Sequence, residues 1–145
     1  MQTREGDVFY GVYTFNENLS VSLESAVPFY RALNMVAGIY IVSRSTIERF
    51  YGKPVCGFIQ GWPLKLAENQ RTDKYVMYIS DDLSHCDRLI TIGHELIHII
   101  LNIQGFQFDF QEIAEDWIDE IAKRFFQRNP GFLEWVYRQE IRIAD

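Results

Sequence analysis

The sequence contains few cysteines and no long apolar segment. Its two cysteines, Cys56 and Cys86, follow neither the spacing of metal ligands nor that of a redox pair. The first residues, Met-Gln-Thr-Arg-Glu-Gly, lack the apolar stretch of a signal peptide. The longest apolar runs, at residues 36–42 and 89–101, are too short or too interrupted for a membrane span, which takes about 20 residues. We therefore expect a soluble protein in a reducing, cytoplasmic setting.

Basic side chains are absent from a large part of the chain. Residues 89–122 contain no Lys or Arg, and the formal net charge of the whole chain is -6. The same segment collects acidic residues: Glu95, Asp109, Glu112, Glu115, Asp116, Asp119 and Glu120. A nucleic-acid surface needs clustered basic residues to displace counterions from phosphates. We therefore expect neither a direct nucleic-acid partner nor a membrane partner.

The length and composition are those of one folded domain. With 145 residues, of which 48% are hydrophobic, the chain can bury a core without disulfide bonds. It has no repeat, no low-complexity tract and no linker rich in Pro, Gly or Ser. We therefore expect a single domain that spans residues 1–145.

The hydrophobic periodicity predicts an α+β fold. Runs of β-branched and aromatic residues predict three strands, at residues 36–42, 54–60 and 74–80, in a small and partly antiparallel sheet. Apolar positions at helical spacing predict helices at residues 18–33, 87–104, 111–127 and 131–143. Pro28 is expected to kink the first helix, and Gly105 and Asn129-Pro130 to end the second and third.

The clearest local pattern is His94-Glu95-Leu96-Ile97-His98. On an α-helix, residues four positions apart lie about 40° apart around the axis and about 6 Å along it, so both imidazoles can reach one metal ion. Neutral imidazole is a good ligand for zinc, and a catalytic zinc site leaves one position for water and lowers its pKa to about 7. Glu95 would lie beside that water and could take its proton.

The surroundings of this motif on the helical wheel support a site. The arc that holds the two histidines and Glu95 is narrow, and Thr91 and Asn102 share it. Apolar residues occupy nearly all of the remaining surface, so the helix should be mostly buried. We expect Thr91 to support the metal site from this arc. The alternative is a surface helix whose thin polar stripe contains two histidines by coincidence.

Two histidines seldom hold zinc alone, so a third ligand is expected elsewhere in the chain. The candidates are His85, Asp109, Glu112, Glu115, Asp116, Asp119 and Glu120. On the wheel of the helix at 111–127, Glu115 falls inside the apolar arc. An ionised carboxylate directed at the core needs a partner, because its burial costs several kcal/mol. Glu115 is therefore the predicted ligand, and a buried salt bridge to Arg88 or Arg124 is the alternative.

The other candidates divide by position. Asp119, one turn after Glu115, could accept the second N–H of a zinc-bound histidine and fix its orientation. Three acidic residues of the same helix face away and are expected to form a solvated surface: Glu112, Asp116 and Glu120. His85 could cap the motif helix, lie exposed, or reach the site and stabilise the oxyanion of the reaction.

The segment Arg88-Leu89-Ile90-Thr91-Ile92-Gly93-His94-Glu95-Leu96-Ile97-His98, followed by Glu115-Asp116-Trp117-Ile118-Asp119-Glu120-Ile121-Ala122, resembles the ImmA/IrrE group of metallopeptidases. The pattern of that group runs Arg-x-Phe-Thr-x-Ala-His-Glu-Leu-Gly-His and then Glu-x-x-Ala-Asn-x-Phe-Ala. Ile97, Ile118 and Asp119 stand where the group usually has Gly, Ala and Asn. The likeness covers roughly residues 75–126, and the Glu-x-x-x-Asp spacing also resembles the wider gluzincin group.

The resemblance implies a zincin-like fold with zinc ligands His94, His98 and Glu115, and with Glu95 as general base. It also implies an intracellular zinc endopeptidase that cleaves a protein, such as a helix-turn-helix transcriptional repressor. Two alternatives stay open. One is a different zinc amide hydrolase, and the other is a catalytically silent, metal-containing binding module. Such a module would use the aromatic C-terminal helix, with Phe132, Leu133, Trp135 and Tyr137.

Overall fold

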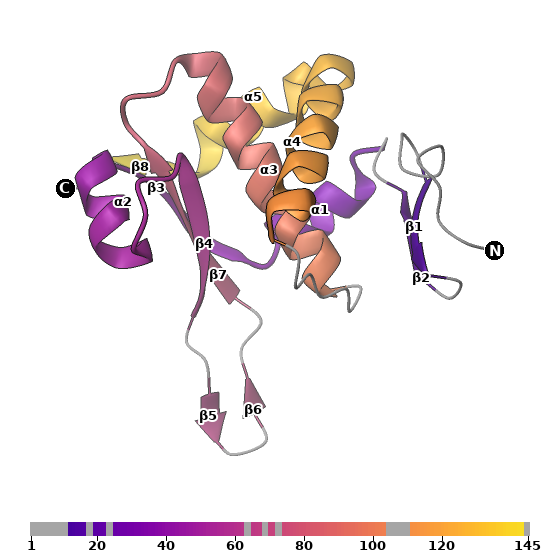
Figure 1. Cartoon of the computed structure of the whole chain (residues 1–145), viewed down its shortest axis with the longest axis horizontal. Helices are drawn as coiled ribbons and strands as arrows, with labels where there is room; N and C mark the ends of the chain where they lie inside the picture. The colour runs from indigo at the N-terminus through magenta and orange to yellow at the C-terminus, as the bar shows by residue number, and fades with distance from the viewer. Residues whose placement is uncertain are drawn as a thin grey trace.

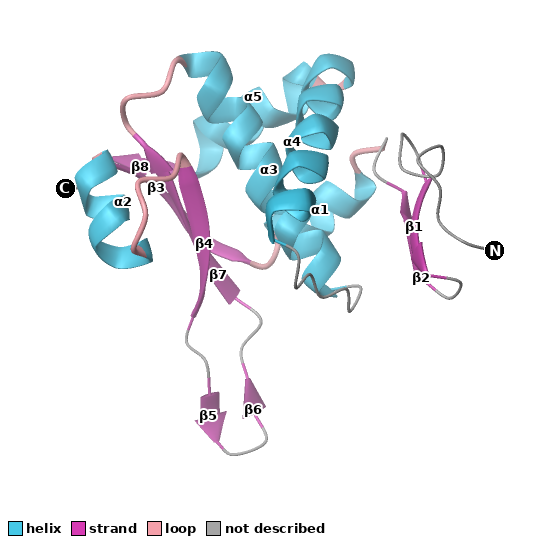
Figure 2. Ribbon diagram, in the orientation of Figure 1, coloured by secondary structure: helices cyan, strands magenta, loops and turns pink. Residues whose placement is uncertain are grey.

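A mixed β-sheet forms the centre of the structure, which is a computed structural model (Figures 1 and 2). The described residues are 12–16, 19–22, 25–62, 65–67, 70–71, 74–103 and 111–143. The strand order of the sheet is β4-β7-β3-β8, formed by Gly57–Trp62, Lys74–Ser80, Val36–Val42 and Ile141–Ile143. β4 runs antiparallel to β7, whereas β7 and β8 both run parallel to β3. The expected α+β fold with a partly antiparallel sheet is confirmed.

Two further pairs of strands lie outside this sheet. β1 (Val12–Asn16) pairs antiparallel with β2 (Leu19–Ser22), and β5 (Lys65–Ala67) pairs antiparallel with β6 (Gln70–Arg71). The second pair extends from the chain between β4 and β7 (Figure 1).

The two faces of the central sheet bury different side chains. Ile39 and Ile41 of β3 belong to the main core with Met77 and Ile79 of β7, on the face that meets α3 (His85–Ile103). Val42 and Phe58 pack on the opposite face with Ile47 of α2 (Arg44–Tyr51). Because β3 and β7 are covered on both faces, their sequences read as nearly continuous apolar runs.

The motif helix α3 lies between the sheet and the other long helices (Figure 2). It packs against α1 (Val27–Leu33), α4 (Gln111–Arg128) and α5 (Pro130–Glu140). Its side chains at Ile92, Leu96, Ile97 and Ile99 are completely buried. Between Thr91 and Leu101, the residues of α3 that are not buried are Thr91, His94 and His98, which all belong to the polar arc. Within the described residues, the structure contains no helix that combines the length and the apolar composition of a membrane span.

Two helix predictions need correction. Residues 18–33 do not form one helix, because Leu19–Ser22 is strand β2 and α1 begins only at Val27. Pro28 lies in the first turn of α1, where a missing N–H costs nothing, so it starts the helix and does not kink it. At the other end, α5 stops at Glu140, and Ile141–Ile143 pairs with β3 as strand β8. The predicted end of α3 at Gly105 lies outside the described residues.

Helix α2 was not predicted, and its ends show why it forms. The Ser43 side chain accepts a hydrogen bond from the backbone N–H of Thr46 at 3.1 Å, which caps the N-terminus. Gly52 follows the last residue with φ of 95°, a left-handed conformation that glycine adopts without strain. These caps fix an eight-residue helix whose last residue, Tyr51, faces α3 across a pocket.

Candidate metal centre

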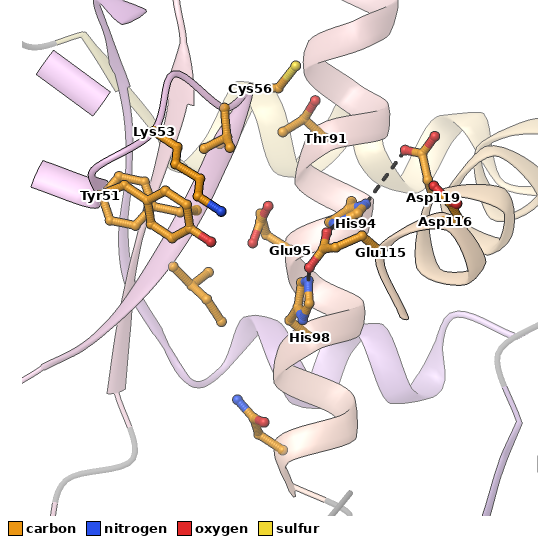
Figure 3. Close-up of a pocket in the computed structure, with 15 residues that line it drawn as sticks. Tyr51, Lys53, Cys56, Thr91, His94, Glu95, His98, Glu115, Asp116 and Asp119 are labelled. Atoms are coloured by element: carbon orange, nitrogen blue, oxygen red, sulfur yellow. Dashed lines mark hydrogen bonds and ion pairs between the residues drawn. The ribbon is translucent and has the colours of Figure 1, made fainter. Parts of the chain in front are cut away.

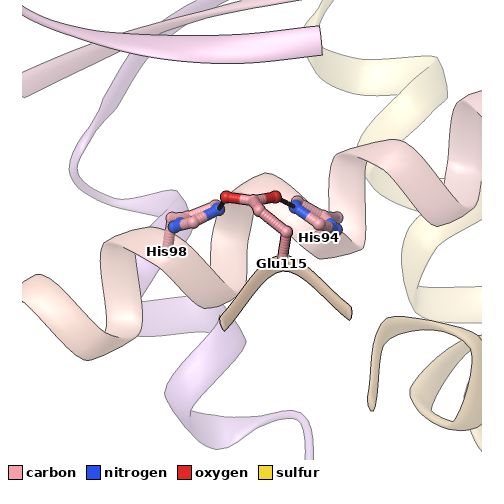
Figure 4. A group of neighbouring side chains, drawn as sticks. All are labelled: His94, His98 and Glu115. Atoms are coloured by element: carbon pink, nitrogen blue, oxygen red, sulfur yellow. Dashed lines mark hydrogen bonds and ion pairs between the residues drawn. The ribbon is translucent and has the colours of Figure 1, made fainter. Parts of the chain in front are cut away.

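The polar arc of α3 contains the two histidines of the motif. Their side chains are partly buried, with 14% of the His94 side chain and 24% of the His98 side chain exposed. Both face Glu115 of α4, because α3 and α4 pack side by side (Figure 4). The packing of these two helices therefore brings together residues that are far apart in the sequence.

The carboxylate of Glu115 lies between the two imidazoles. Its Oε1 atom is 2.6 Å from Nε2 of His94, and its Oε2 atom is 3.0 Å from Nε2 of His98. One ligand atom from each of the three residues lies within 4.8 Å of the others. Two imidazole nitrogens and a carboxylate are a donor set that zinc and other divalent transition metals accept. His94, His98 and Glu115 therefore lie close enough to hold a metal ion.

The charges around this group favour a cation. Burial would lower the pKa of His94, but the carboxylates of Asp119, Glu115 and Glu95 outweigh it and raise the pKa to about 10. Burial would raise the pKa of Glu115, but hydrogen bonds from His94 and His98 outweigh it and hold that pKa well below its usual range. The triad thus combines negative charge with the imidazole of His94, which must lose a proton to bind a metal.

Asp119 lies on the far side of the His94 ring. Its Oδ1 atom is 3.6 Å from Nδ1 of His94, which is longer than a hydrogen bond, and its Oδ2 atom is 3.2 Å from the ammonium of Lys123. His94 and Lys123 together lower the pKa of Asp119 against the effect of burial. Asp119 therefore faces the ring nitrogen that a metal bound at Nε2 would leave free.

Glu95 is the most buried carboxylate of the site. Glu95 is 5% exposed, and its carboxylate takes part in no hydrogen bond between described residues. Burial raises the pKa of Glu95, while the charges of His94 and His98 act in the opposite direction. The group therefore sits beside the imidazoles in an environment that favours taking up a proton.

These residues border an open pocket with a volume of about 810 Å³ (Figure 3). One wall consists of α3 and α4 and carries the triad, Glu95 and Asp119. The opposite wall is formed by β4, the end of α2 and the loop between them. The walls touch closely at one end, where a Cβ atom on Gly57 would lie 2.8 Å from the methyl group of Thr91. Glycine at this position lets β4 approach α3.

The other candidate site residues from the sequence do not belong to the triad, and each has different surroundings. Thr91 borders the pocket, but its hydroxyl donates to the Asp87 carbonyl oxygen at 2.7 Å within its own helix. His85 lies outside the pocket, where its Nε2 atom is 2.7 Å from Oε1 of Glu134 on α5. The side chains of Asp109 and Glu112 fall outside the described residues.

Three expectations about orientation need revision. The Glu115 side chain is 43% exposed, so it lies at the edge of the apolar arc of α4 and not in the core. Arg88 donates to the hydroxyl of Tyr137 and to the Asp81 carbonyl oxygen, and within the described residues it forms no hydrogen bond or ion pair with Glu115. Asp116 was expected to face away, yet it borders the pocket. A helical wheel cannot show these positions, because the neighbouring elements decide which part of a helix surface is covered.

The wall opposite the triad contains residues that sequence analysis did not identify. Tyr51 and Lys53 border the pocket, and in Figure 3 the polar ends of both point toward Glu95. Their positions depend on α2, a short helix that was not predicted, and on its packing against the sheet, so nothing in the sequence linked them to the histidine motif. Comparisons with protein-family models, curated proteins and solved structures gave no significant match. The likeness to ImmA/IrrE peptidases therefore rests on the motif residues.

Proposed function

We propose that this protein is a zinc-dependent peptidase with a zincin-like fold, and that it cleaves a protein substrate inside the cell. One observation carries the proposal: the buried carboxylate of Glu95 adjoins three side chains that lie close enough to hold a metal ion. A metal site that served only to stabilise the fold would need its ligands but no buried carboxylate beside them. An open pocket next to the same residues supplies access for a substrate.

The residues present fit zinc. His94 and His98 would supply nitrogen ligands and Glu115 an oxygen ligand, a set found in catalytic zinc sites with a position left for water. When bound, zinc supplies Lewis-acid chemistry that polarises a carbonyl and makes water a better nucleophile. Asp119 would hold the His94 ring in the orientation needed for binding through Nε2.

Glu95 is the general base of the proposed reaction. It would take a proton from the attacking water and later deliver this proton to the leaving amine. Burial raises the pKa of Glu95, which makes the carboxylate a stronger base than an exposed one. Its position on the same helix as both histidines fixes its distance from the site where water is activated.

The pocket suits an extended peptide. β4 lies at one end of the strand order, so one edge of it is not paired within the described sheet. Gly57 and Ile59 of β4 border the pocket, so a peptide in extended conformation could lie beside this strand and cross the triad. The resemblance to ImmA/IrrE peptidases extends the proposal to a DNA-binding repressor as substrate. That repressor would be a separate protein.

We also place this activity in a reducing compartment such as the cytoplasm. Both cysteines, Cys56 and Cys86, are free and exposed. Free exposed thiols are typical of proteins that work where thiols are kept reduced.

The test combines metal content with proteolysis. Purified wild-type protein, Glu95→Gln and the control Glu120→Gln, an exposed residue of α4, are reconstituted with zinc and analysed by plasma mass spectrometry. Each is then incubated with a peptide library, and new termini are identified by mass spectrometry. We expect about one zinc per chain in all three proteins, and cleavage by wild type and Glu120→Gln but not by Glu95→Gln.

Other outcomes would reject the proposal in different ways. Protein that binds no zinc after reconstitution would make the histidine pair a structural coincidence. Protein that binds zinc but cleaves no better than Glu95→Gln would favour a binding module that keeps the metal without catalysis. Hydrolysis of small amides but not of peptides would identify a different class of zinc hydrolase.

A further inference from the structure

The pocket places hydrogen-bond donors opposite the acidic residues of the site. The α3 and α4 wall carries Glu95, Glu115, Asp116 and Asp119. When water adds to a carbonyl group, negative charge develops on the carbonyl oxygen, and a positioned donor that meets this charge is usually a large source of rate enhancement. A wall dominated by carboxylates cannot supply that donor from its acidic groups, so the donor must come from another polar side chain of the pocket.

Three polar side chains on the α3 wall, those of Thr91 and the two histidines, do not qualify. The Thr91 hydroxyl donates to the carbonyl oxygen of Asp87 and is therefore occupied. The two histidines are assigned to the metal. On the opposite wall, the sulfur of Cys56 is directed away from both histidines (Figure 3) and lies 3.9 Å from Nη1 of Arg44. On this opposite wall, Tyr51 and Lys53 are the donors that point toward Glu95.

Tyr51 is held in place by the fold. It is the last residue of α2, and the left-handed Gly52 turns the chain immediately after it. Its ring packs on the ring of Phe58 from β4, with 5.1 Å between the centroids. Phe58 in turn stacks on Tyr78 of β7, with 5.0 Å between the centroids. A side chain with two torsion angles, packed in this way, presents its hydroxyl with little loss of conformational entropy on binding.

The phenol also lies within electrostatic reach of the site. Burial raises the pKa of Tyr51, and the negative charges of Glu115 and Glu95 raise it further. The hydroxyl therefore keeps its proton at neutral pH and can donate a hydrogen bond.

We propose that Tyr51 is a further catalytic residue, whose hydroxyl donates a hydrogen bond to the carbonyl oxygen of the substrate as water adds to it. This inference rests on the proposed peptidase function. No proton leaves the phenol, and the O–H bond stays intact through the step. Lys53 is the competing donor, but its ammonium ends an exposed four-carbon side chain with no hydrogen bond or ion pair among the described residues. It would have to be ordered before it could act.

The experiment measures binding as well as turnover. Zinc-reconstituted wild type, Tyr51→Phe, Lys53→Met and Tyr30→Phe are titrated calorimetrically with phenylphosphonate, a tetrahedral anion, and with imidazole, a metal ligand that lacks such oxygens. Tyr30 is a matched control because it is a tyrosine of α1 that is 49% exposed, as Tyr51 is, and it does not border the pocket. Zinc content and circular dichroism verify that each variant is folded and loaded.

We expect Tyr51→Phe to bind phenylphosphonate about 10- to 100-fold more weakly, since it loses one charge-assisted hydrogen bond. Its affinity for imidazole should be unchanged, and Tyr30→Phe should match wild type with both probes. With a cleaved peptide as substrate, kcat of Tyr51→Phe should fall by about 100-fold with little change in KM.

Equal affinity of wild type and Tyr51→Phe for phenylphosphonate, with zinc bound, would overturn the assignment of Tyr51 and leave the proposed function intact. A loss in Lys53→Met alone would overturn it in favour of the ammonium. Failure of every variant to bind zinc would overturn both, because no site would exist for either. Weaker phenylphosphonate binding by Tyr51→Phe in a protein that cleaves no peptide would support the donor role and reject the peptidase function.

Discussion

Oε1 of Glu115 lies 2.6 Å from Nε2 of His94, although 21 residues separate the two in the chain. The contact exists because α3 and α4 pack side by side and line the same pocket with polar side chains. Oε2 of Glu115 also lies 3.0 Å from Nε2 of His98, so one carboxylate contacts both imidazoles. This arrangement makes Glu115 the residue whose loss should most clearly separate metal binding from folding.

Replacement of Glu115 by alanine should abolish stoichiometric zinc binding. The variant keeps two histidines but loses the third donor, and two side-chain ligands seldom hold zinc alone. Its stability without metal should fall modestly, because the variant also loses the contacts of Glu115 with His94 and His98, and solvent screens a side chain that is 43% exposed. Plasma mass spectrometry measures zinc per chain, with Asp116→Ala, which removes the neighbouring carboxylate of the pocket, as control. Full zinc in Glu115→Ala would show that another residue completes the site.

Replacement of Asp119 by alanine should weaken zinc binding without abolishing it. Asp119 faces Nδ1 of His94, and loss of such an orienting carboxylate typically reduces metal affinity about 10- to 100-fold. Asp119→Asn keeps an oxygen acceptor and should lose less. Competition with a chromophoric chelator measures the affinities, and Lys123→Met tests whether the ion pair with Asp119 matters separately. Equal affinities in wild type and Asp119→Ala would remove Asp119 from the site.

Much of the fold followed from the sequence because long elements repeat their pattern many times. β3 and β7 are buried on both faces, so their apolar runs identified them, and α3 and α4 showed a sustained helical period. The histidine pair needed only local geometry, since both residues lie on one helix. Short elements carried less information: α2 has eight residues and β8 has three, and both are stabilised by contacts with the sheet.

The candidate site, too, could be predicted from the sequence only where its residues lie close together on one helix. Residues related by helical spacing, such as His94, Glu95 and His98, could be grouped from the sequence. The exposure of Glu115 and the pocket position of Asp116 depend on which neighbouring elements cover α4, and a single helix cannot reveal that. Tyr51 borders the pocket opposite α3, and Gly57 lets β4 approach α3; both positions depend on contacts between distant parts of the chain.

Replacement of Gly57 by alanine should destabilise the protein and disturb the pocket. The new Cβ atom would lie 2.8 Å from both the Thr91 methyl carbon and the backbone oxygen of Tyr78. Since the second neighbour is backbone, β4 must move, and overpacking of this kind costs about 1–3 kcal/mol. Urea denaturation measures the free energy of unfolding. Thr91→Ser in the same background should restore little, because the clash with Tyr78 remains.

Gly93 provides the matched control on the opposite side of α3. A Cβ atom there would meet Leu133 at 3.4 Å and Ala122 at 3.8 Å, which are ordinary van der Waals distances. Gly93→Ala should therefore be neutral or stabilise the protein by up to about 1 kcal/mol, because alanine favours a helix interior more than glycine does. If Gly57→Ala and Gly93→Ala changed the free energy of unfolding equally, the inference that β4 closely approaches α3 at Gly57 would be wrong.

The ion pair between Arg44 and Asp82 should make stability depend on pH at low values. Nη2 and Nε of Arg44 donate to the two oxygens of Asp82 at 2.7 and 2.8 Å, and Ser80 donates to Oδ1 at 2.7 Å. The Arg44 hydrogen bonds, with that from Ser80, lower the pKa of Asp82 from 3.8 to about 2.

Because the folded pKa of Asp82 lies below the unfolded value, its contribution is fully present above pH of about 4 and is lost as the pH falls toward 2. Asp82→Asn should therefore be less stable than wild type at pH 7, by about 1 kcal/mol after allowance for solvent screening of these exposed groups. The difference should shrink as the pH falls through this range. Urea unfolding at several pH values tests this, with Asp81→Asn as the neighbouring control. A difference that stays constant down to pH 2 would show that Asp82 stabilises the fold through something other than its charge.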